Sequence, residues 1–276
     1  MNVLVATDGS KYGRWALNWV AMLPFVEQPS VIALHVLDSA ALRLPFRTKL
    51  EIQRIGARSA RTLKEATQQL ASLKLKGTVR KVQGTVASTI LNRAPKRDGL
   101  LVVGSQGLDA LDRFMLGSVS TNLIHHATCP VLVVKDEAAP LRRITLATDG
   151  SSASAKALEF MLRKFQPDRS TGKGRRVPIH VSVIHVMPFI KYPGLMEAGH
   201  KLIEQSVQKL IKAGFTAEPV CQLGKPAEEI MKVASKHHAD LIVMGAQGLG
   251  GIARFLLGSV STRVVQHASC AVLVVR

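Results

Sequence analysis

Short apolar runs recur along the chain, separated by stretches of mixed polarity. NVLVAT at 2–7, SVIALHVL at 30–37, LLVV at 100–103 and VLVVK at 131–135 are rich in β-branched and apolar residues. Runs of this length and composition are typical of strands buried on both faces. VRKVQ at 79–83 instead alternates apolar and polar residues, which predicts an edge strand.

Helical periodicity fills the intervals between these runs. Apolar residues from Trp15 to Leu23 recur at helical spacing, and residues 49–75 form a long amphipathic pattern with a basic outer side. Gly77 follows the long pattern and is expected to act as its C-terminal glycine cap. Residues 85–95 predict a shorter helix.

The second half of the chain repeats the first. GSQGLDALDRFMLGSVST begins at Gly104 and GAQGLGGIARFLLGSVST begins at Gly245, and 19 of the 32 positions that start at these glycines are identical. A period of domain size indicates two tandem copies of one domain rather than a solenoid. We place the domains at 1–138 and 139–276.

The second copy contains the same elements at shifted positions. The pattern predicts a strand at 181–187, a long helix at 197–213, an edge strand at 217–223 and a short helix at 226–238. The Gly-rich, basic segment at 167–176 is expected to be an exposed, mobile loop.

Strands that alternate with helices at this spacing predict βαβ units and a parallel sheet. Crossovers between parallel strands are right-handed almost without exception. We therefore expect two three-layer α/β/α domains, each with a five-stranded parallel sheet of Rossmann-like type. In such folds ligands bind at the carboxyl ends of the strands, where the strand order reverses.

The repeated stretch reads Gly-x-x-Gly, nine residues, then Gly-Ser. A loop that approaches phosphates closely needs glycine, and a helix N-terminus offers unpaired N–H groups to an anion. Ser118 or Ser120 is expected to cap the following helix and to donate a hydroxyl to a phosphate. The glycines could instead make tight turns alone, but two copies after predicted parallel strands favour phosphate binding. The pattern is neither a Walker A motif nor the Rossmann G-x-G-x-x-G.

With the VSxxxxxHAxCxVLVV run that follows it, this pattern resembles the universal stress protein family, of which the chain looks like a tandem member. The resemblance covers nearly the whole of both halves and implies the ATP-binding type of domain, with a fold like that of the adenine nucleotide alpha hydrolases. It implies ATP, with Mg²⁺ or Mn²⁺ held through the phosphates. Because single-domain members pair through their last strands, VLVVK and VLVVR could form an internal pseudo-dimer, and a homodimer stays open.

The resemblance also implies which residues bind the nucleotide. The loop would hold the phosphates and ribose, an acidic residue after the first strand would reach the ribose or the metal, and a valine of the second strand would hold the adenine through its backbone. Small and apolar residues would wall the adenine pocket. The first site would comprise Ala6, Asp8, Val36, Val103, Gly104, Gly107, Gly117, Ser118, Val119 and Ser120. The second would comprise Ala147, Asp149, Val186, Met244, Gly245, Gly248, Gly258, Ser259, Val260 and Ser261.

The chain departs from the family in the third residue of the loop. Many members carry Arg or His there, whereas this chain has Gln106 and Gln247. Glutamine can bond a phosphate but brings no charge, which lowers the expected affinity. Arg113 and Arg254 could supply that charge or could form a solvated loop face.

Several polar residues have an ordinary structural interpretation as well. Asp8 and Asp149 precede glycine, and Asp-Gly is a strong turn signal. His126 and His267 lie late in a predicted helix, where histidine is electrostatically favoured, and we interpret them as structural. His35 and its counterpart His185 could line the pocket or lie on the sheet face. His237-His238 has no third ligand in view, so no dedicated metal site is expected.

Composition restricts the class of protein. No apolar run approaches the ~18–20 residues that span a membrane, and Met1 leads almost at once into a strand, which predicts a cytoplasmic protein without a signal peptide. Three cysteines without CxxC spacing predict reduced thiols rather than a disulfide framework.

The net charge of +18 is shared by both halves and favours anionic partners. Aromatic residues make up only 4%, so few platforms could stack bases.

Two functions from different classes follow from these patterns. The first is a nucleotide-dependent stress-response or regulatory protein that binds ATP in one or both domains. The second is a basic protein that binds nucleic acid or another polyanion and whose nucleotide sites are vestigial. The sequence shows no dedicated general base or nucleophile, so slow ATP hydrolysis or self-phosphorylation would be incidental. No G-x-S-x-G elbow supports a hydrolase.

Overall fold

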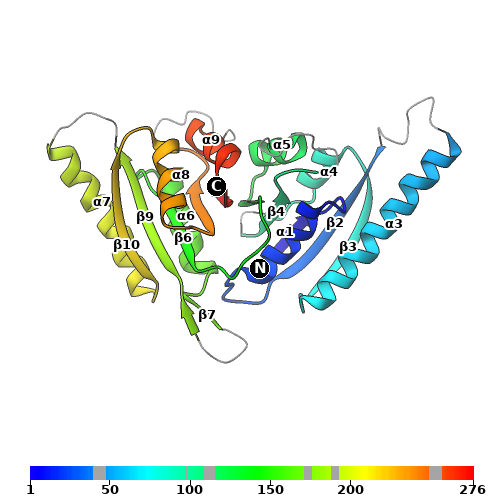
Figure 1. The fold of residues 1–276 in the computed structure, drawn as a ribbon, viewed down its shortest axis with the longest axis horizontal. Coiled ribbons are helices and arrows are strands. Elements are labelled where there is room, and N and C mark those ends of the chain that lie inside the picture. The colour runs from blue at the N-terminus through cyan, green and yellow to red at the C-terminus, as the bar shows by residue number, and fades with distance from the viewer. Residues whose placement is uncertain (40–47, 97, 108–115, 171–175, 188–192, 249–256) are drawn as a thin grey trace. The chain divides into compact units, whose positions relative to one another are not determined.

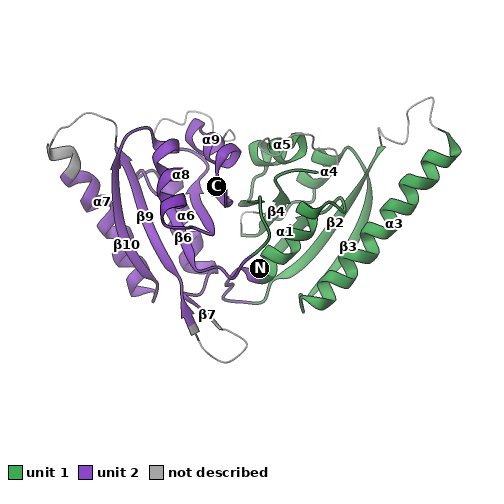
Figure 2. Cartoon of the chain, in the orientation of Figure 1, with its two compact units in different colours: residues 1–21, 28–138 green, residues 22–27, 139–276 purple. Residues whose placement is uncertain are grey.

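The computed structural model describes residues 1–39, 48–96, 98–107, 116–170, 176–187, 193–248 and 257–276. The chain divides into two compact units (Figure 2). Unit 1 comprises Met1–Ala21 and Gln28–Ala138, and unit 2 comprises Met22–Glu27 and Ala139–Arg276. Each unit has the parallel α/β architecture that the sequence predicts.

Unit 1 alternates strands and helices along the chain (Figure 1). Its elements are β1 (Asn2–Ala6), α1 (Lys11–Met22, whose last residue is assigned to unit 2), β2 (Ser30–Asp38), α3 (Lys49–Ser72), β3 (Gly77–Gly84), α4 (Val86–Leu91), β4 (Leu100–Gly104), α5 (Ser118–His126) and β5 (Val131–Val134).

The five strands of unit 1 form a parallel sheet in the order β5-β4-β1-β2-β3. β1 lies between its two partners, with Val3 beside Val31 of β2 on one side and Leu100 of β4 on the other. The chain therefore leaves β1 in one direction for β2 and β3 and in the other for β4 and β5. This reversal places a crevice at the carboxyl ends of β1 and β4.

α3 shows how the polar and apolar pattern becomes a packed helix. Thr48 caps its N-terminus: the Glu51 N–H donates to Thr48 Oγ1 at 3.2 Å, and the Thr48 N–H donates to Glu51 Oε2 at 2.7 Å. Ser59, Thr62 and other residues spaced three or four apart are buried against the sheet, while the remaining faces stay in solvent.

The predicted glycine cap of α3 is wrong. The helix ends at Ser72, and Lys74 adopts the left-handed conformation with φ 54°, whereas Gly77 already begins β3. In unit 2 the corresponding position after the long helix is Gly214, with φ 91°. The left-handed position exists in both units, but only unit 2 fills it with the residue that adopts it without strain.

Unit 2 repeats this order with one addition. Its elements are β6 (Arg143–Ala147), α6 (Ser152–Lys164), β7 (Asp168–Ser170), β8 (Arg176–Pro178), β9 (His180–Met187), α7 (Pro193–Lys212), β10 (Thr216–Leu223), α8 (Pro226–Lys236), β11 (Leu241–Gly245), α9 (Ser259–His267) and β12 (Ala271–Val275). The parallel strand order is β10-β9-β6-β11-β12.

The segment expected to be an exposed loop at 167–176 is partly a small ribbon. β7 and β8 pair antiparallel, with Arg169 opposite Val177. Residues 171–175, at the centre of that segment, lie outside the described residues. The loop prediction failed because Gly and basic residues dominate the composition, while two strands of three residues leave almost no periodic pattern.

Candidate functional site

The Asp-Gly-Ser turn fixes a carboxylate at the end of β1. The Ser10 N–H donates to Asp8 Oδ1 at 2.9 Å, and Gly9 takes φ 84°. Ser10 Oγ then accepts the Gly13 N–H at 3.1 Å and begins α1. Asp8 is thus both the turn residue and a carboxylate at the crevice, so the two sequence interpretations of this residue are compatible.

Unit 2 repeats this turn after β6. The Ser151 N–H donates to Asp149 Oδ1 at 3.0 Å, Gly150 takes φ 79°, and Ser151 Oγ accepts the Ser154 N–H at 3.2 Å. Equal residues in equal positions therefore give equal local geometry.

A backbone hydrogen bond joins the two ends of the glycine loop in each unit. In unit 1 the Gly117 N–H donates to the Ser105 carbonyl at 2.8 Å, and in unit 2 the Gly258 N–H donates to the Ala246 carbonyl at 2.8 Å. Both ends of the loop therefore lie at the end of β4 in unit 1 and at the end of β11 in unit 2. Arg113 and Arg254, considered as charge donors, lie outside the described residues.

The first glycine of each loop is required by packing. A Cβ at Gly104 would lie 2.5 Å from Tyr12 Cβ, and one at Gly245 would lie 2.5 Å from the backbone carbon of Ala153. These glycines therefore allow the strand end to pack directly against α1 or α6.

The second glycine brings the loop against the carboxylate. A Cβ at Gly107 would lie 2.9 Å from Asp8 Oδ2, and one at Gly248 would lie 2.6 Å from Asp149 Oδ2. The loop and the aspartate thus share one edge of the crevice, and a side chain at either glycine would displace the carboxylate.

The prediction that Ser118 or Ser120 caps the helix is wrong. Gly117 is the N-cap of α5 and makes no side-chain cap bond, while Ser120 Oγ donates to the Gly104 carbonyl at 2.6 Å. In unit 2 the N-cap is Gly258, and Ser261 Oγ donates to the Ala246 carbonyl at 2.7 Å. Ser120 thus joins α5 to the last residue of β4, and Ser261 joins α9 to the residue after β11. The first-turn N–H groups of each helix are left without a side-chain cap. Such groups attract anions.

These elements enclose a cavity of about 530 Å³ in unit 1. All ten residues predicted for the first site line it: Ala6, Asp8, Val36, Val103, Gly104, Gly107, Gly117, Ser118, Val119 and Ser120. Residues from 6 to 120 are brought together because the carboxyl ends of parallel strands share one edge.

Unit 2 encloses a cavity of about 380 Å³ in the same place. The ten residues predicted for the second site line it: Ala147, Asp149, Val186, Met244, Gly245, Gly248, Gly258, Ser259, Val260 and Ser261. Their role in binding a ligand stays a prediction.

Sequence reasoning missed part of each wall. Leu34 and Ile90 line the first cavity, and Ile184 and Ile230 line the second. Ile90 and Ile230 stand on α4 and α8, the short helices predicted at 85–95 and 226–238. The two isoleucines occupy the same position in the repeat, 140 residues apart, and this correspondence is the sequence signal that could have indicated a shared role in the cavity wall.

Asp38, at the end of β2, is a second carboxylate in the wall of the first cavity. The second cavity has Asp149 as the only acidic residue among its described lining. This difference was not visible from the glycine pattern, because β2 and the loop are far apart in sequence.

The histidines left open by the sequence lie beside the crevice rather than in it. His35 Nδ1 donates to the Thr7 carbonyl at 3.0 Å, and His185 Nδ1 donates to the Thr148 carbonyl at 2.8 Å. Neither is among the described residues that line the cavities. His35 instead ties β2 to Thr7, and His185 ties β9 to Thr148, the residues before the two aspartates. His126 Nδ1 donates to the Asn122 carbonyl at 2.9 Å, in keeping with a structural role.

Within the described part of the chain, no three His, Cys, Asp or Glu side chains gather in a way that could hold a metal ion. No helix in the described ranges is long and apolar enough to cross a membrane. Cys129 and Cys270 are buried, and partial burial raises the pKa of the Cys221 thiol above its ordinary value.

Comparison with known proteins agrees with the fold and its duplication. The sequence model of the universal stress protein family matches residues 1–135 and again 140–276. A universal stress protein of Mycolicibacterium smegmatis is 30% identical over 298 aligned positions, which cover 99% of this chain and 96% of that protein. The chain is also 27% identical to universal stress protein Rv2005c of Mycobacterium tuberculosis, over 99% of this chain and 96% of the relative.

A solved structure shares the whole architecture. A universal stress protein from Archaeoglobus fulgidus superposes with a TM-score of 0.74 at 22% identity, covering 100% of this chain and 96% of its own. At that identity the likeness concerns the fold alone, and it extends over both units.

Proposed function

Because the chain belongs to the universal stress protein family, we propose that each unit binds an adenine nucleotide, namely ATP with Mg²⁺ or Mn²⁺ on its phosphates. Occupancy of the two sites would then set the protein's regulatory state. The observation that carries the proposal is the pair of cavities built from matching repeat positions at the strand ends. Their volumes of about 530 and 380 Å³ lie within the range of about 300–1,000 Å³ usual for small-molecule sites.

The walls of each cavity divide into an apolar end and a polar end. In unit 1 Leu34, Val36 and Ile90 form an apolar wall, which suits an aromatic base. The glycine loop and the N-terminus of α5 form the polar end, where backbone N–H groups and the helix dipole suit phosphates. A nucleotide has these same two ends.

The carboxylates suit a metal that arrives with the nucleotide. Asp8 and Asp149 face the glycine loop of their units, and hard oxygen ligands are those that Mg²⁺ and Mn²⁺ prefer. Mg²⁺ usually binds through one or two carboxylates together with substrate phosphates. One aspartate per site is therefore enough for a metal that the phosphates carry.

The proposal assigns regulation rather than catalysis. Ser120 and Ser261 both donate their hydroxyls to backbone carbonyls. A backbone carbonyl cannot take up the proton, so neither hydroxyl is activated for phosphoryl transfer. Any hydrolysis or self-phosphorylation would be slow and incidental.

Native mass spectrometry and calorimetry with ATP, ADP, AMP and adenosine, with and without Mg²⁺, test the proposal. We expect two nucleotides per chain. Gly107→Ala should weaken one site and Gly248→Ala the other, because each new methyl group pushes the facing carboxylate away. Gly56→Ala, where a Cβ would meet nothing within 4 Å, is the matched control. Absence of any adenine nucleotide binding up to millimolar concentration would contradict the proposal.

A second candidate function, binding of a polyanion such as nucleic acid, is supported by the charge of +18 and pI of about 10.3. Such binding releases counterions, so its affinity must fall steeply as salt rises. A filter-binding series with duplex DNA and with RNA from 50 to 200 mM salt tests this function. Retention that has vanished by about 150 mM salt would count against a physiological role.

A further inference from the structure

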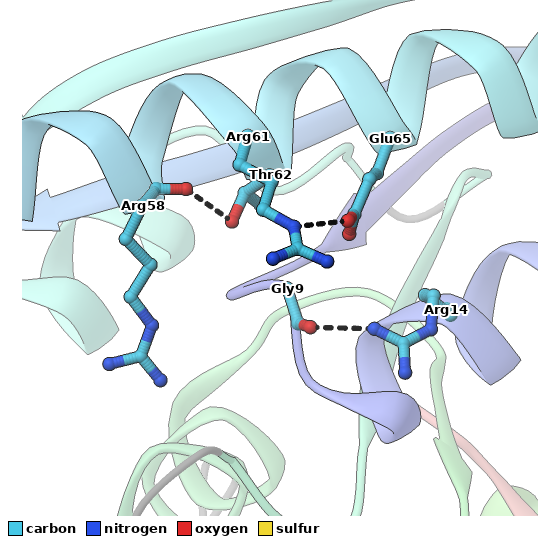
Figure 3. A network of polar contacts seen from close by, with 6 residues as sticks. All are labelled: Gly9, Arg14, Arg58, Arg61, Thr62 and Glu65. Carbon is cyan, nitrogen blue, oxygen red and sulfur yellow. Dashed lines mark hydrogen bonds and ion pairs between the residues drawn. The ribbon is translucent and has the colours of Figure 1, made fainter.

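A separate cavity of about 200 Å³ lies on unit 1, between the Gly9 turn and α3. We name it the arginine cleft, and its lining consists of Asp8, Gly9, Arg14, Arg58, Arg61, Thr62 and Glu65. Figure 3 shows the guanidinium groups of Arg14 and Arg61 close to Gly9 and that of Arg58 farther off, on the other side of Thr62. Asp8 also borders the larger cavity, so the cleft adjoins the nucleotide site.

Two of the arginines have donors to spare. Arg14 uses Nη1 to donate to the Gly9 carbonyl at 2.8 Å (Figure 3), which holds its guanidinium at the turn and leaves its other N–H groups available. The Arg58 guanidinium makes no hydrogen bond or ion pair to any residue in the described ranges. Each guanidinium carries five N–H donors in a rigid fork that matches the oxygens of a phosphate.

The third arginine is held by an acid that an anion could replace. Arg61 Nε donates to Glu65 Oε1 at 2.8 Å, and the Arg61 side chain is 81% exposed. An exposed ion pair of this kind contributes only about 0–1 kcal/mol. With the carboxylates of Asp8 and Glu65 against three guanidinium groups, the cleft keeps one net positive charge.

The corresponding surface of unit 2, between the Gly150 turn and α7, lacks this cluster of arginines. A Cβ at Gly9 would meet Thr62, and one at Gly150 would meet Leu202, so α3 and α7 align at an offset of 140 residues. By this offset Arg58, Arg61 and Glu65 correspond to Ala198, Lys201 and Gln205, while the offset of 141 residues between Gly9 and Gly150 pairs Arg14 with Ala155. The basic cleft is therefore a property of unit 1 and not of the fold.

We propose that the arginine cleft binds a small phosphate-type anion, at a site separate from the nucleotide cavity. The volume of about 200 Å³ is below the range of about 300–1,000 Å³ usual for sites that hold a whole organic ligand, whereas a phosphate or pyrophosphate group fits. Guanidinium forks from α1 and α3 approach the anion from two sides, which gives bidentate recognition. The shared chemistry is the phosphate group, whether as free orthophosphate, as pyrophosphate or as the end of a phosphomonoester.

Calorimetry on the full chain, at constant ionic strength with chloride as the exchanged anion, tests the site. The probes are orthophosphate, pyrophosphate and glycerol phosphate, and their ranking identifies the source of the phosphate group. We expect saturable binding of one anion per chain. Arg58→Ala and Arg61→Ala should each weaken it at least about tenfold, since a bond to a charged group is lost.

Two further variants separate a built site from diffuse charge. Lys64→Ala removes an exposed cation of α3 that is not in the lining of the cleft, and it should leave phosphate affinity unchanged. Glu65→Gln releases Arg61 from its ion pair and should strengthen phosphate binding. The melting temperature of each variant, measured without phosphate, checks that the exposed substitutions leave the fold intact.

The proposal is overturned by any of three results. Binding that does not saturate below about 10 mM would mean that the arginines are only a solvated surface of α3. Equal losses in Lys64→Ala and Arg58→Ala would mean that net charge alone attracts the anion. Binding that survives both arginine substitutions would place the anion at the glycine loops instead, where the nucleotide experiment already measures it.

Discussion

Unit 1 and unit 2 build their cavities from the same strand ends and the same glycine–serine loop, yet the walls differ. The first encloses about 530 Å³ with two carboxylates, Asp8 and Asp38, and the second about 380 Å³ with Asp149. The linings also differ where the first helix of each unit begins, since Ser154 lines the second cavity at the position that Gly13 has in the first. The two units share the backbone frame and nine of the ten matched site residues, and they differ at Val103 and Met244 and elsewhere in the wall.

The two units also differ where the turn after the first strand meets the long helix. In unit 1 the Gly9 turn meets the polar Thr62 and the arginine cleft, whereas the Gly150 turn of unit 2 meets Leu202. Thr62 and Leu202 pack against the two turns at corresponding positions but differ in polarity, and the exposed Arg58 and Arg61 correspond to Ala198 and Lys201. Exposed positions can differ in this way because the cost in stability is small.

The largest loss of stability is expected at the loop glycines that pack against a helix, Gly104 and Gly245. Gly245→Ala puts a methyl group 2.5 Å from the Ala153 backbone, and Gly104→Ala puts one 2.5 Å from the Tyr12 side chain. Tyr12 Cβ is fixed to the backbone of α1, and the Tyr12 backbone carbon would lie 3.0 Å from the same methyl group, so in both variants a helix has to shift. We expect each to lose about 2–3 kcal/mol of unfolding free energy, with the larger loss for Gly245→Ala, where backbone atoms of Ala153 and Ser154 lie within 2.8 Å.

Calorimetric unfolding of both variants measures these losses. Gly56→Ala, in an exposed turn of α3, is the control and should stabilise by about 0.5–1 kcal/mol. Equal melting temperatures for the Gly245 variant and the unmodified protein would show that the strand end is not packed as tightly as the structure indicates.

The ends of the long helices give the next effect. Lys74 and Gly214 hold corresponding left-handed positions, with φ 54° and 91°. Lys74→Gly should raise the free energy of unfolding by about 1 kcal/mol, and Gly214→Lys should lower it by about 1–2 kcal/mol. Urea unfolding of the two variants checks the opposite signs. The same sign for both would show that these two helix ends are not equivalent.

The second carboxylate of unit 1 should weaken its affinity for nucleotide phosphates. Asp38→Asn removes one like charge from the wall of the larger cavity. We expect ATP affinity in unit 1 to rise by no more than about fivefold, which corresponds to about 1 kcal/mol. Titration of this variant at 50 and 300 mM salt checks the origin of the change, because screening should shrink an electrostatic gain. A gain that does not depend on salt would point to a hydrogen bond of Asp38 instead.

The smallest expected effect is on the alkylation rate of the Cys221 thiol. Cys221 of β10 stands where unit 1 has Lys81, by the register of each edge strand with its neighbour. Burial raises the pKa of the Cys221 thiol, so less of it is thiolate near neutral pH than for a free cysteine. Alkylation at pH 7.5 should be slower than for a model thiol and should accelerate as pH rises. Mass spectrometry of the labelled peptides measures the rates. Reaction faster than the model thiol would contradict the raised pKa.

Most of the fold could be predicted because strong periodic patterns mark its elements. The buried strand LLVV at 100–103 became β4, and the amphipathic stretch from residue 49 became α3. Prediction failed where the pattern was short or the conformation unusual. β7 and β8 have three residues each, and the left-handed residue after α3 is Lys74 rather than a glycine.

The candidate site could be predicted in its loop but not in its full wall. Gly107 and Gly117 are conspicuous in the sequence because glycine repeats at fixed spacing. Ile90 was not conspicuous, since an apolar residue on a short helix has the same pattern whether it packs on the sheet or lines a cavity.

By itself, the sequence determined the duplication, the parallel α/β class and the position of the glycine loop at the strand ends. These follow from burial periodicity and from backbone conformations that particular residues favour, and both are local properties. Only the tertiary structure decided that Ser120 fastens α5 to the Gly104 carbonyl instead of capping its helix. It alone brought Arg14 of α1 and Arg58 of α3, 44 residues further along the chain, into the lining of one cleft. Distances between side chains of separate elements are set by how those elements pack, and packing depends on the whole core at once.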